Sequence, residues 1–153
     1  MRRIFIDTNA FFKARKIFET LIDEGYELVT SSIVIYEFLK VIDELIYEEK
    51  NEERRKLYLR IKKRFPKLLR ELNVKILSHN LSYDDVEEAI ELSEKMNVDI
   101  GDALIFKLIK SERINSILTY DKDWERFNIN ILSLIHISEP TRPLYISYAV
   151  FCL

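Results

Sequence analysis

The segment Ile-Phe-Ile-Asp-Thr-Asn, residues 4–9, decides the fold class of this 153-residue chain. A continuous apolar run that ends on an acid is typical of a central strand covered on both faces. Short apolar runs of this kind alternate along the chain with longer segments of helical period, as in βαβ units around a parallel sheet. The predicted strands are residues 3–7, 27–30, 74–77, 116–119 and 129–132, and the predicted helices are residues 11–24, 33–49, 52–72 with an interruption at Pro66, 83–96 and 102–111.

The composition indicates one soluble globular domain. Hydrophobic residues make up 48% of the chain and charged residues 33%, and the formal net charge is −2, so there is no global basic signature for nucleic acid. No run approaches the roughly 18 apolar residues that a membrane span needs. The N-terminus has no signal-peptide pattern, and Cys152 is the single cysteine. We therefore expect a cytoplasmic protein without a membrane partner.

The C-terminal stretch differs in composition from the rest of the chain. Residues 134–153 contain two of the three prolines and the only cysteine, and few charges. We predict that residues 1–133 form the functional domain and that residues 134–153 are a vector-derived or read-through tail. The alternative is a genuine final strand, because residues 144–153 are apolar and aromatic enough to pair.

Four acidic residues stand where an α/β fold builds its sites. Asp7 ends one predicted strand and Asp121 follows another, whereas Glu37 and Asp102 lie in early turns of predicted helices. The carboxyl ends of parallel strands and the starts of the following helices converge on one crevice. Carboxylates gathered there would repel one another unless a divalent cation held them, and oxygen ligands of this kind suit magnesium or manganese.

Each acid taken alone also has an ordinary structural explanation. Asp7 and Asp102 are suited to helix caps, Glu37 to a solvent-facing helical position, and Asp121 to an Asx turn. The combination of all four favours a site. Two further acids, Asp99 and Asp123, are alternatives for the last two places; we expect Asp123 to face outward in the turn that packs Trp124 and Phe127.

Four segments, in order, resemble the motifs of the PIN-domain nuclease family. They are Ile-Phe-Ile-Asp-Thr-Asn at residues 4–9, Tyr-Glu-Phe at 36–38, Gly-Asp-Ala-Leu-Ile at 101–105 and Leu-Thr-Tyr-Asp-Lys-Asp-Trp at 118–124. The resemblance covers residues 1–133, and the chain is similar in size to stand-alone VapC-type toxin ribonucleases. It implies a Rossmann-like three-layer α/β/α sandwich with a five-stranded parallel sheet, and RNA cleavage that depends on Mg²⁺ or Mn²⁺.

The resemblance also implies roles for individual residues. Asp7, Glu37 and Asp102 match the metal-binding acids of the family, and Asp121 matches its less constant fourth acid. Two polar residues, Asn9 and Thr119, match positions that orient the carboxylates. The family further implies a homodimer and, for its toxins, an antitoxin protein as partner.

Other chemistries are poorly supported by the residues present. His79 is the only histidine before residue 134, so the usual zinc ligand sets cannot be built. The two glycines, Gly25 and Gly101, stand too far apart for a phosphate-binding loop of the Walker or dinucleotide type.

One predicted helix carries a basic face opposite its apolar stripe. Lys56, Arg60, Lys63 and Lys67 recur at helical spacing, and such a face could follow a phosphate backbone or contact a protein partner. The same pattern is equally typical of a solvated helix face.

These observations predict a Mg²⁺- or Mn²⁺-dependent endoribonuclease, the toxin of a toxin–antitoxin pair. The alternatives are a catalytically silent PIN-like binding or dimerisation module and a structure-specific DNA nuclease. The RNA target and the number of metal ions stay open.

Overall fold

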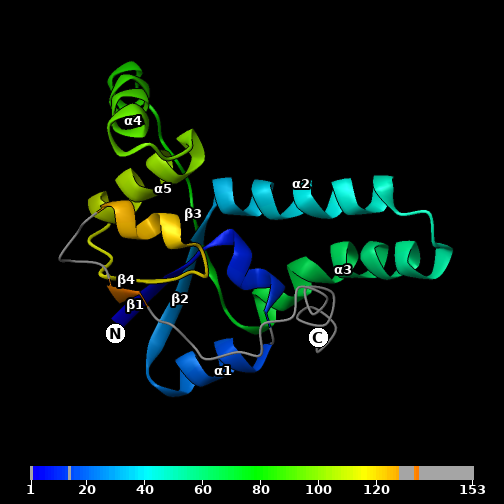
Figure 1. The fold of residues 1–153 in the computed structure, drawn as a ribbon. Helices are drawn as coiled ribbons and strands as arrows, with labels where there is room; N and C mark the ends of the chain where they lie inside the picture. The colour runs from blue at the N-terminus through cyan, green and yellow to red at the C-terminus, as the bar shows by residue number, and fades with distance from the viewer. Residues whose placement is uncertain (1, 14, 128–132, 135–153) are drawn as a thin grey trace.

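The computed structural model describes residues 2–13, 15–127 and 133–134. Its core is a parallel sheet with strand order β3-β2-β1-β4-β5, so the predicted α/β class is confirmed. Figure 1 shows helices around this sheet. The strands are β1 (Arg2–Ile6), β2 (Tyr26–Ser31), β3 (Lys75–Leu77), β4 (Ser116–Leu118) and β5 (Ser133–Leu134). Every neighbouring pair of strands in this order is parallel.

Strand β1 lies at the centre because its apolar residues face protein on both sides. Ile4, Phe5 and Ile6 are fully buried, which explains why they form a continuous apolar run and do not alternate with polar residues. Phe5 pairs with Val29 of β2 on one side and with Ile117 of β4 on the other. The order of the strands reverses between β1 and β4, and in open α/β sheets ligands bind at such a reversal, beyond the carboxyl ends of the strands.

The helices follow the predicted pattern with three differences. Their bounds are α1 (Arg15–Asp23), α2 (Ser32–Glu48), α3 (Glu52–Glu71), α4 (Tyr83–Met96) and α5 (Ile100–Ser111), with the short 3₁₀ helices η1 (Thr8–Phe12) and η2 (Lys122–Phe127). The helix predicted from residue 11 is wrong at its start, because Phe11 and Phe12 belong to η1. The Asp7 side chain accepts from the Thr8 N–H and so begins this separate 3₁₀ turn directly after β1. Gly25 ends the α1 region with φ of 93°, a value that favours glycine.

The predicted interruption at Pro66 is also wrong, because α3 continues through it. A proline within a helix removes one backbone donor, here the donor to the Lys62 carbonyl. Pro66 is exposed, so water can reach that part of the helix. Buried side chains on both sides of the proline, Phe65 and Leu68, hold the helix against the core.

Helix α5 begins two residues earlier than predicted. Asp99 is its N-cap and accepts from the Asp102 N–H at 2.8 Å, so Asp102 lies inside the first turn. A capping box begins α4, where Ser82 and Asp85 each accept from the other's backbone N–H.

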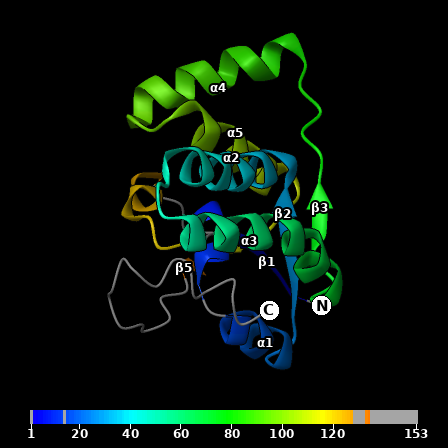
Figure 2. The same ribbon diagram turned by 90° about the vertical axis from the view of Figure 1, so that its right-hand side faces the viewer.

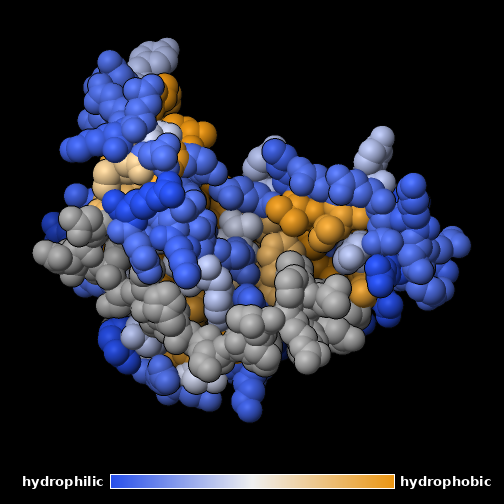
Figure 3. Space-filling model, viewed as in Figure 1, coloured by the Kyte–Doolittle hydropathy of each residue, from blue (hydrophilic) through white to orange (hydrophobic). Residues whose placement is uncertain are grey.

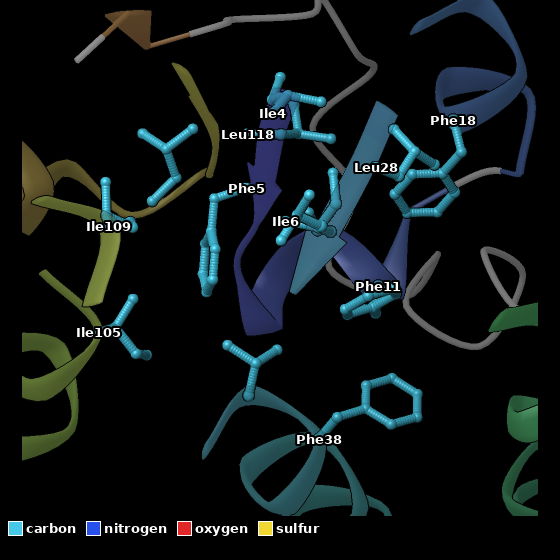
Figure 4. Packing of buried hydrophobic residues seen from close by; sticks show 14 of the residues in the cluster. Ile4, Phe5, Ile6, Phe11, Phe18, Leu28, Phe38, Ile105, Ile109 and Leu118 are labelled. Carbon is cyan, nitrogen blue, oxygen red and sulfur yellow. The ribbon is translucent and has the colours of Figure 1, made fainter. Parts of the chain in front are cut away.

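The core occupies both faces of the sheet. Figure 4 shows Phe5 on the side of β1 towards Ile105 and Ile109 of α5, and Phe18 of α1 on the other side, beyond Leu28. Helices α2 and α3 pair as an antiparallel hairpin that extends away from the sheet (Figures 1 and 2). The base of this hairpin is held by aromatic contacts, including the stacked rings of Phe38 and Phe65 with centroids 4.1 Å apart.

Four of the five predicted strands are found near their expected positions. The fifth, at residues 129–132, lies outside the described residues, and that edge of the sheet carries the two-residue β5, which pairs Ser133 with Ser116. Residues 135–153 of the predicted tail also lie outside the described residues. Among the described residues, none of the helices has the length and apolar character needed to cross a membrane.

Candidate active site

The four predicted acids come from four elements that meet at the carboxyl edge of the sheet. Asp7 directly follows β1 and Asp121 follows β4, whereas Glu37 and Asp102 lie in early turns of α2 and α5. Their charges act on one another: Asp7, Asp121 and Glu37 all contribute to raising the pKa of Asp102. The structure therefore places all four predicted acids in one electrostatically coupled cluster.

Asp7 is the most constrained of these carboxylates. It is only 5% exposed. Its Oδ1 accepts from the Thr8 N–H at 2.8 Å, and its Oδ2 accepts from the Thr119 hydroxyl at 2.8 Å and from the Trp124 indole N–H at 3.0 Å. Burial raises the pKa of Asp7, the three hydrogen bonds oppose that shift, and the charge of Asp121 adds to it. These donors fix the orientation of the carboxylate.

Thr119 and Asn9 connect the ends of β1 and β4. The buried Thr119 hydroxyl donates to Asp7 and accepts from the Asp121 N–H at 3.1 Å. The Asn9 side chain donates to this hydroxyl at 3.5 Å and accepts from the Tyr120 N–H at 3.0 Å. Both residues thus lie behind the acids, at positions where they can orient them.

The Glu37 carboxylate is short of hydrogen-bond donors. The Thr8 hydroxyl donates to its Oε2 at 3.4 Å. Its Oε1 is buried, and no hydrogen-bond partner for it is found among the residues that the structure describes. Burial, followed by the charges of Asp7 and Asp99, raises the pKa of Glu37 to about 7. A buried carboxylate oxygen that lacks a donor is costly and calls for a proton or a cation.

Asp102 shows the larger shift. Burial comes first and the charge of Asp99 second in raising its pKa to about 8, and the other three acids add to the effect. At neutral pH this side chain therefore holds a proton for much of the time. The dipole of α5 favours a negative charge in the first turn and so acts to lower the pKa of Asp102. This effect is weaker than the combined effect of burial and of the four neighbouring acids, which raise the pKa.

The preceding residue, Gly101, leaves space for the cluster. A Cβ atom at this position would lie 3.0 Å from Glu37 Oε1 and 3.2 Å from Asp99 Oδ1. Glu37 therefore lies directly against the backbone of α5, and a larger residue at position 101 would displace one of the two carboxylates.

The structural roles expected for isolated acids coexist with the cluster. Asp99 caps α5, and Asp121 forms an Asx turn by accepting from the Asp123 N–H at 2.9 Å. Asp123 pairs with Arg126 at 3.4 Å, in line with its expected outward position. Asp99 stays in the cluster through its effects on Glu37 and Asp102.

The chemistry of this cluster fits a hard divalent cation. Carboxylate oxygens are the ligands that Mg²⁺ and Mn²⁺ prefer, and Glu37 Oε1 is a buried acceptor in need of positive charge. In the described part of the chain, however, no three acidic side chains already surround a single point at ligand distances. Asp7, Glu37, Asp102 and Asp121 are the residues that could hold such an ion.

The basic residues predicted to contact RNA or a partner lie apart from this cluster. Lys56, Arg60, Lys63 and Lys67 are all exposed on α3. Figure 3 shows the outer surfaces of the α2–α3 hairpin as hydrophilic, with apolar side chains between the two helices. Lys67 is 3.7 Å from Glu71, which offsets part of its charge. The eleven-residue separation of Lys56 and Lys67 spreads the basic face over about 16 Å of helix.

Two residues of the site had no predicted role in it. Trp124 was expected only to pack in the turn after Asp121, yet its indole N–H reaches Asp7. Gly101 was recognised as part of a motif but not as the space for Glu37. The signal for Trp124 was its place three residues after Asp121, since a buried indole N–H needs an acceptor.

Comparison with known proteins places this chain in a family. The sequence pattern of the PIN domain matches residues 4–130, which include all four acids. The chain is 28% identical over 141 residues to Ribonuclease VapC6 of Methanocaldococcus jannaschii, a match that covers 80% of this chain and 91% of that protein.

Solved structures share the fold at low sequence identity. The PAE2754 protein of Pyrobaculum aerophilum has a TM-score of 0.63 with 12% identity over 87% of this chain and 89% of that one. VapBC2 from Rickettsia felis, solved bound to a DNA fragment from its promoter, has a TM-score of 0.54 with 19% identity over 86% of this chain and 98% of that one. A toxin–antitoxin complex from Klebsiella pneumoniae has a TM-score of 0.54 with 18% identity over 85% and 95%.

Proposed function

Because the chain belongs to the PIN-domain family, we propose that it is an endoribonuclease that hydrolyses RNA phosphodiester bonds with Mg²⁺ or Mn²⁺. We further propose that it is the toxin of a toxin–antitoxin pair. The observation that carries the nuclease proposal is the acidic cluster. In it the buried Glu37 Oε1 has no donor among the described residues, and the pKa of Asp102 is raised to about 8. The toxin role is supported by similarity to Ribonuclease VapC6 and to the folds of toxin–antitoxin proteins.

The proposed chemistry follows from the charge of the substrate. A divalent ion bound by these carboxylates would neutralise the phosphodiester and lower the pKa of an attacking water. Asp7 would provide the fixed ligand, because three donors already hold its carboxylate. Glu37 and Asp102 would provide the remaining negative charge, and they must give up the protons that their raised pKa values favour. Asp121 lies at the β4 side of the cluster and would add charge there.

The partners we propose are an RNA substrate, an antitoxin protein and a second copy of the chain as a homodimer. Lys56, Arg60, Lys63 and Lys67 form an exposed basic face that could bind the RNA backbone or an acidic segment of a partner. We place this function in residues 1–133 and in the cytoplasm.

RNA cleavage by the full-length chain tests the nuclease proposal. Purified protein is incubated with labelled structured RNA and Mn²⁺, with a chelator in a parallel reaction and branched DNA in another. Asp7→Asn, purified and assayed in the same way, serves as the variant expected to be inactive. Asp84→Asn is the matched control, because Asp84 is an exposed acid on α4 outside the cluster.

We expect the wild-type protein and Asp84→Asn to cleave RNA, and cleavage to be lost with the chelator and with Asp7→Asn. Equal cleavage by Asp7→Asn would exclude this site as the source of activity. Metal binding without cleavage of either nucleic acid would favour a silent binding module, and a preference for branched DNA would favour a DNA nuclease.

A further inference from the structure

We infer that Trp124 is a positioning residue of the active site, and that its indole N–H orients Asp7 for binding of the divalent ion. This inference rests on the proposed function. It assigns a role to a side chain that the sequence pattern alone would place only in the core.

The contact joins two buried groups from distant parts of the chain. Trp124 is 2% exposed and Asp7 is 5% exposed, and the Nε1–Oδ2 distance is 3.0 Å. The two residues are 117 positions apart in the sequence. Because both groups are removed from water, this hydrogen bond to a carboxylate is not weakened by solvent competition.

The surrounding aromatic residues hold the indole in place. The Phe127 ring lies 4.9 Å from the Trp124 ring, and Phe127 in turn stacks on Phe106 of α5 at 4.4 Å. Such pairs prefer particular orientations, so the ring is fixed in angle as well as in position. The indole N–H therefore points at Asp7 from a rigid support that links η2 to α5.

The distribution of donors on Asp7 indicates what this contact does. A carboxylate has about four acceptor positions. Thr119 and Trp124 donate to Oδ2, whereas within the described part of the chain Oδ1 accepts only from the Thr8 N–H. Without the indole N–H, Oδ2 would keep a single side-chain donor, and the carboxylate could rotate within its pocket. Trp124 thus keeps Oδ1 as the oxygen with room for a further partner.

A purely structural role for Trp124 predicts a different outcome. In that case the ring fills the core and the indole N–H only donates a hydrogen bond to a nearby oxygen. Loss of the N–H would then change the melting temperature with no specific effect on ion binding. The two roles can be separated by removing the N–H while keeping the ring.

The experiment uses the fact that the chain has one tryptophan. Trp124 is replaced in the full-length protein by benzothienylalanine, which has the shape of tryptophan with sulfur in place of the N–H, and by Phe in a second variant. Mg²⁺ affinity is measured by calorimetry without RNA, alongside the melting temperature. Phe18→Leu is the control, since it removes a buried aromatic ring from α1 on the far side of the sheet.

We expect the benzothienylalanine protein to bind Mg²⁺ about tenfold or more weakly, as is typical when a group that orients a metal ligand is removed. Its melting temperature should stay close to that of the wild type. Phe18→Leu should show the opposite result: its melting temperature should be lower, and its Mg²⁺ affinity should be unchanged. In the wild type, Mg²⁺ should also change the emission of Trp124, and Asp7→Asn should abolish this change.

The outcomes distinguish failure of this inference from failure of the proposed function. If the wild type binds Mg²⁺, Asp7→Asn does not, and the benzothienylalanine protein binds as tightly as the wild type, Trp124 is only a core residue and the inference is overturned. If the wild type and Asp7→Asn both fail to bind Mg²⁺, the proposed metal-dependent function fails and the role of Trp124 fails with it.

Discussion

The two sides of the acidic cluster are built differently. On the strand side, Asp7 is held by the Thr8 N–H, the Thr119 hydroxyl and the Trp124 indole. On the helix side, the described residues give Glu37 one long hydrogen bond and leave its other oxygen without a partner. No hydrogen bond to the Asp102 carboxylate is found among the described residues.

This difference shows how the fold divides the roles within the site. The strand side uses its hydrogen bonds to fix one carboxylate, which is what a rigid first ligand requires. The helix side leaves two carboxylates partly buried and short of donors, so they hold protons or need a cation. Asp7 is thus a rigid ligand, and it lies beside Glu37 and Asp102, which lack compensating positive charge. Without a metal ion, the repulsion between these acids destabilises the folded protein.

The largest effect should come from removing charge on the helix side. Asp102→Asn should reduce RNA cleavage on the order of a thousandfold, because bound metal contributes several kcal/mol to the transition state. At pH 8 without metal, the same variant should melt at a higher temperature than the wild type, since it removes a carboxylate crowded by others. Activity assays and thermal unfolding by circular dichroism check both effects. If Asp102→Asn is inactive and also less stable than the wild type without metal, the helix-side acids do not destabilise the metal-free protein, and the proposed difference between the two sides is contradicted.

A smaller effect should come from weakening the strand side. Thr119→Val keeps the shape of the side chain but removes the donor to Asp7 and the acceptor for the Asp121 N–H. We expect Mg²⁺ affinity to fall about tenfold to a hundredfold and the free energy of unfolding to fall by about 1–3 kcal/mol. Calorimetry and chemical denaturation measure the two quantities. Unchanged Mg²⁺ affinity would show that the strand side does not orient Asp7.

Gly101→Ala tests the contact between the two helices that carry the helix-side acids. The added methyl group would lie 3.0 Å from Glu37 Oε1, so we expect about a tenfold loss of cleavage. Stability should change little, because alanine favours the helix by about 1 kcal/mol and offsets the crowding. Gly25→Ala is the matched control: its φ of 93° is strained for alanine, but no atom lies within 4 Å of the new methyl group. It should lower stability and leave cleavage intact, and equal activity of both variants would contradict the crowding of Glu37.

The smallest effect should come from the basic face of α3, outside the cluster. The double variant Lys56→Gln and Lys63→Gln should raise KM for RNA a few-fold with kcat unchanged. It should also lower the salt dependence of binding by about 0.7 for each RNA phosphate that the variant no longer neutralises. The control exchanges two exposed lysines on other helices, Lys16→Gln and Lys95→Gln. The same salt dependence in both double variants would mean that this α3 surface does not bind the RNA backbone.

Much of the fold and the convergence of the four acids could be predicted because both depend on local patterns. The apolar run at residues 4–6 indicates a central strand, and an acid after such a strand lies at the carboxyl edge of a parallel sheet. The capping box of α4 and the left-handed glycine after α1 are equally local features.

The remaining features depend on contacts between distant residues. The acceptor of the Trp124 N–H lies 117 residues away, so nothing near Trp124 in the sequence identifies it. Pro66 was expected to interrupt α3, but buried neighbours on both sides keep the helix intact. Asp99 replaced Asp102 as the cap of α5, because aspartate suits either position and only the packed structure decides between them.

The most direct test of the mutual repulsion in the cluster is the melting temperature of the wild type between pH 5 and pH 9, with chelator or with Mg²⁺. Folding raises the pKa of Glu37 from 4.5 to about 7 and that of Asp102 from 3.8 to about 8. The folded state therefore binds protons more tightly than the unfolded state, and the stability that these protons provide is lost as pH rises through about 7 to 8.

We predict that in chelator the melting temperature falls from pH 5 to pH 9, and that Mg²⁺ removes most of this fall by replacing the lost protons. The Asp102→Asn variant should show a weaker fall in chelator. A melting temperature that does not fall across this range in chelator, and that Mg²⁺ leaves unchanged, would contradict a cluster of mutually repelling carboxylates that a cation stabilises.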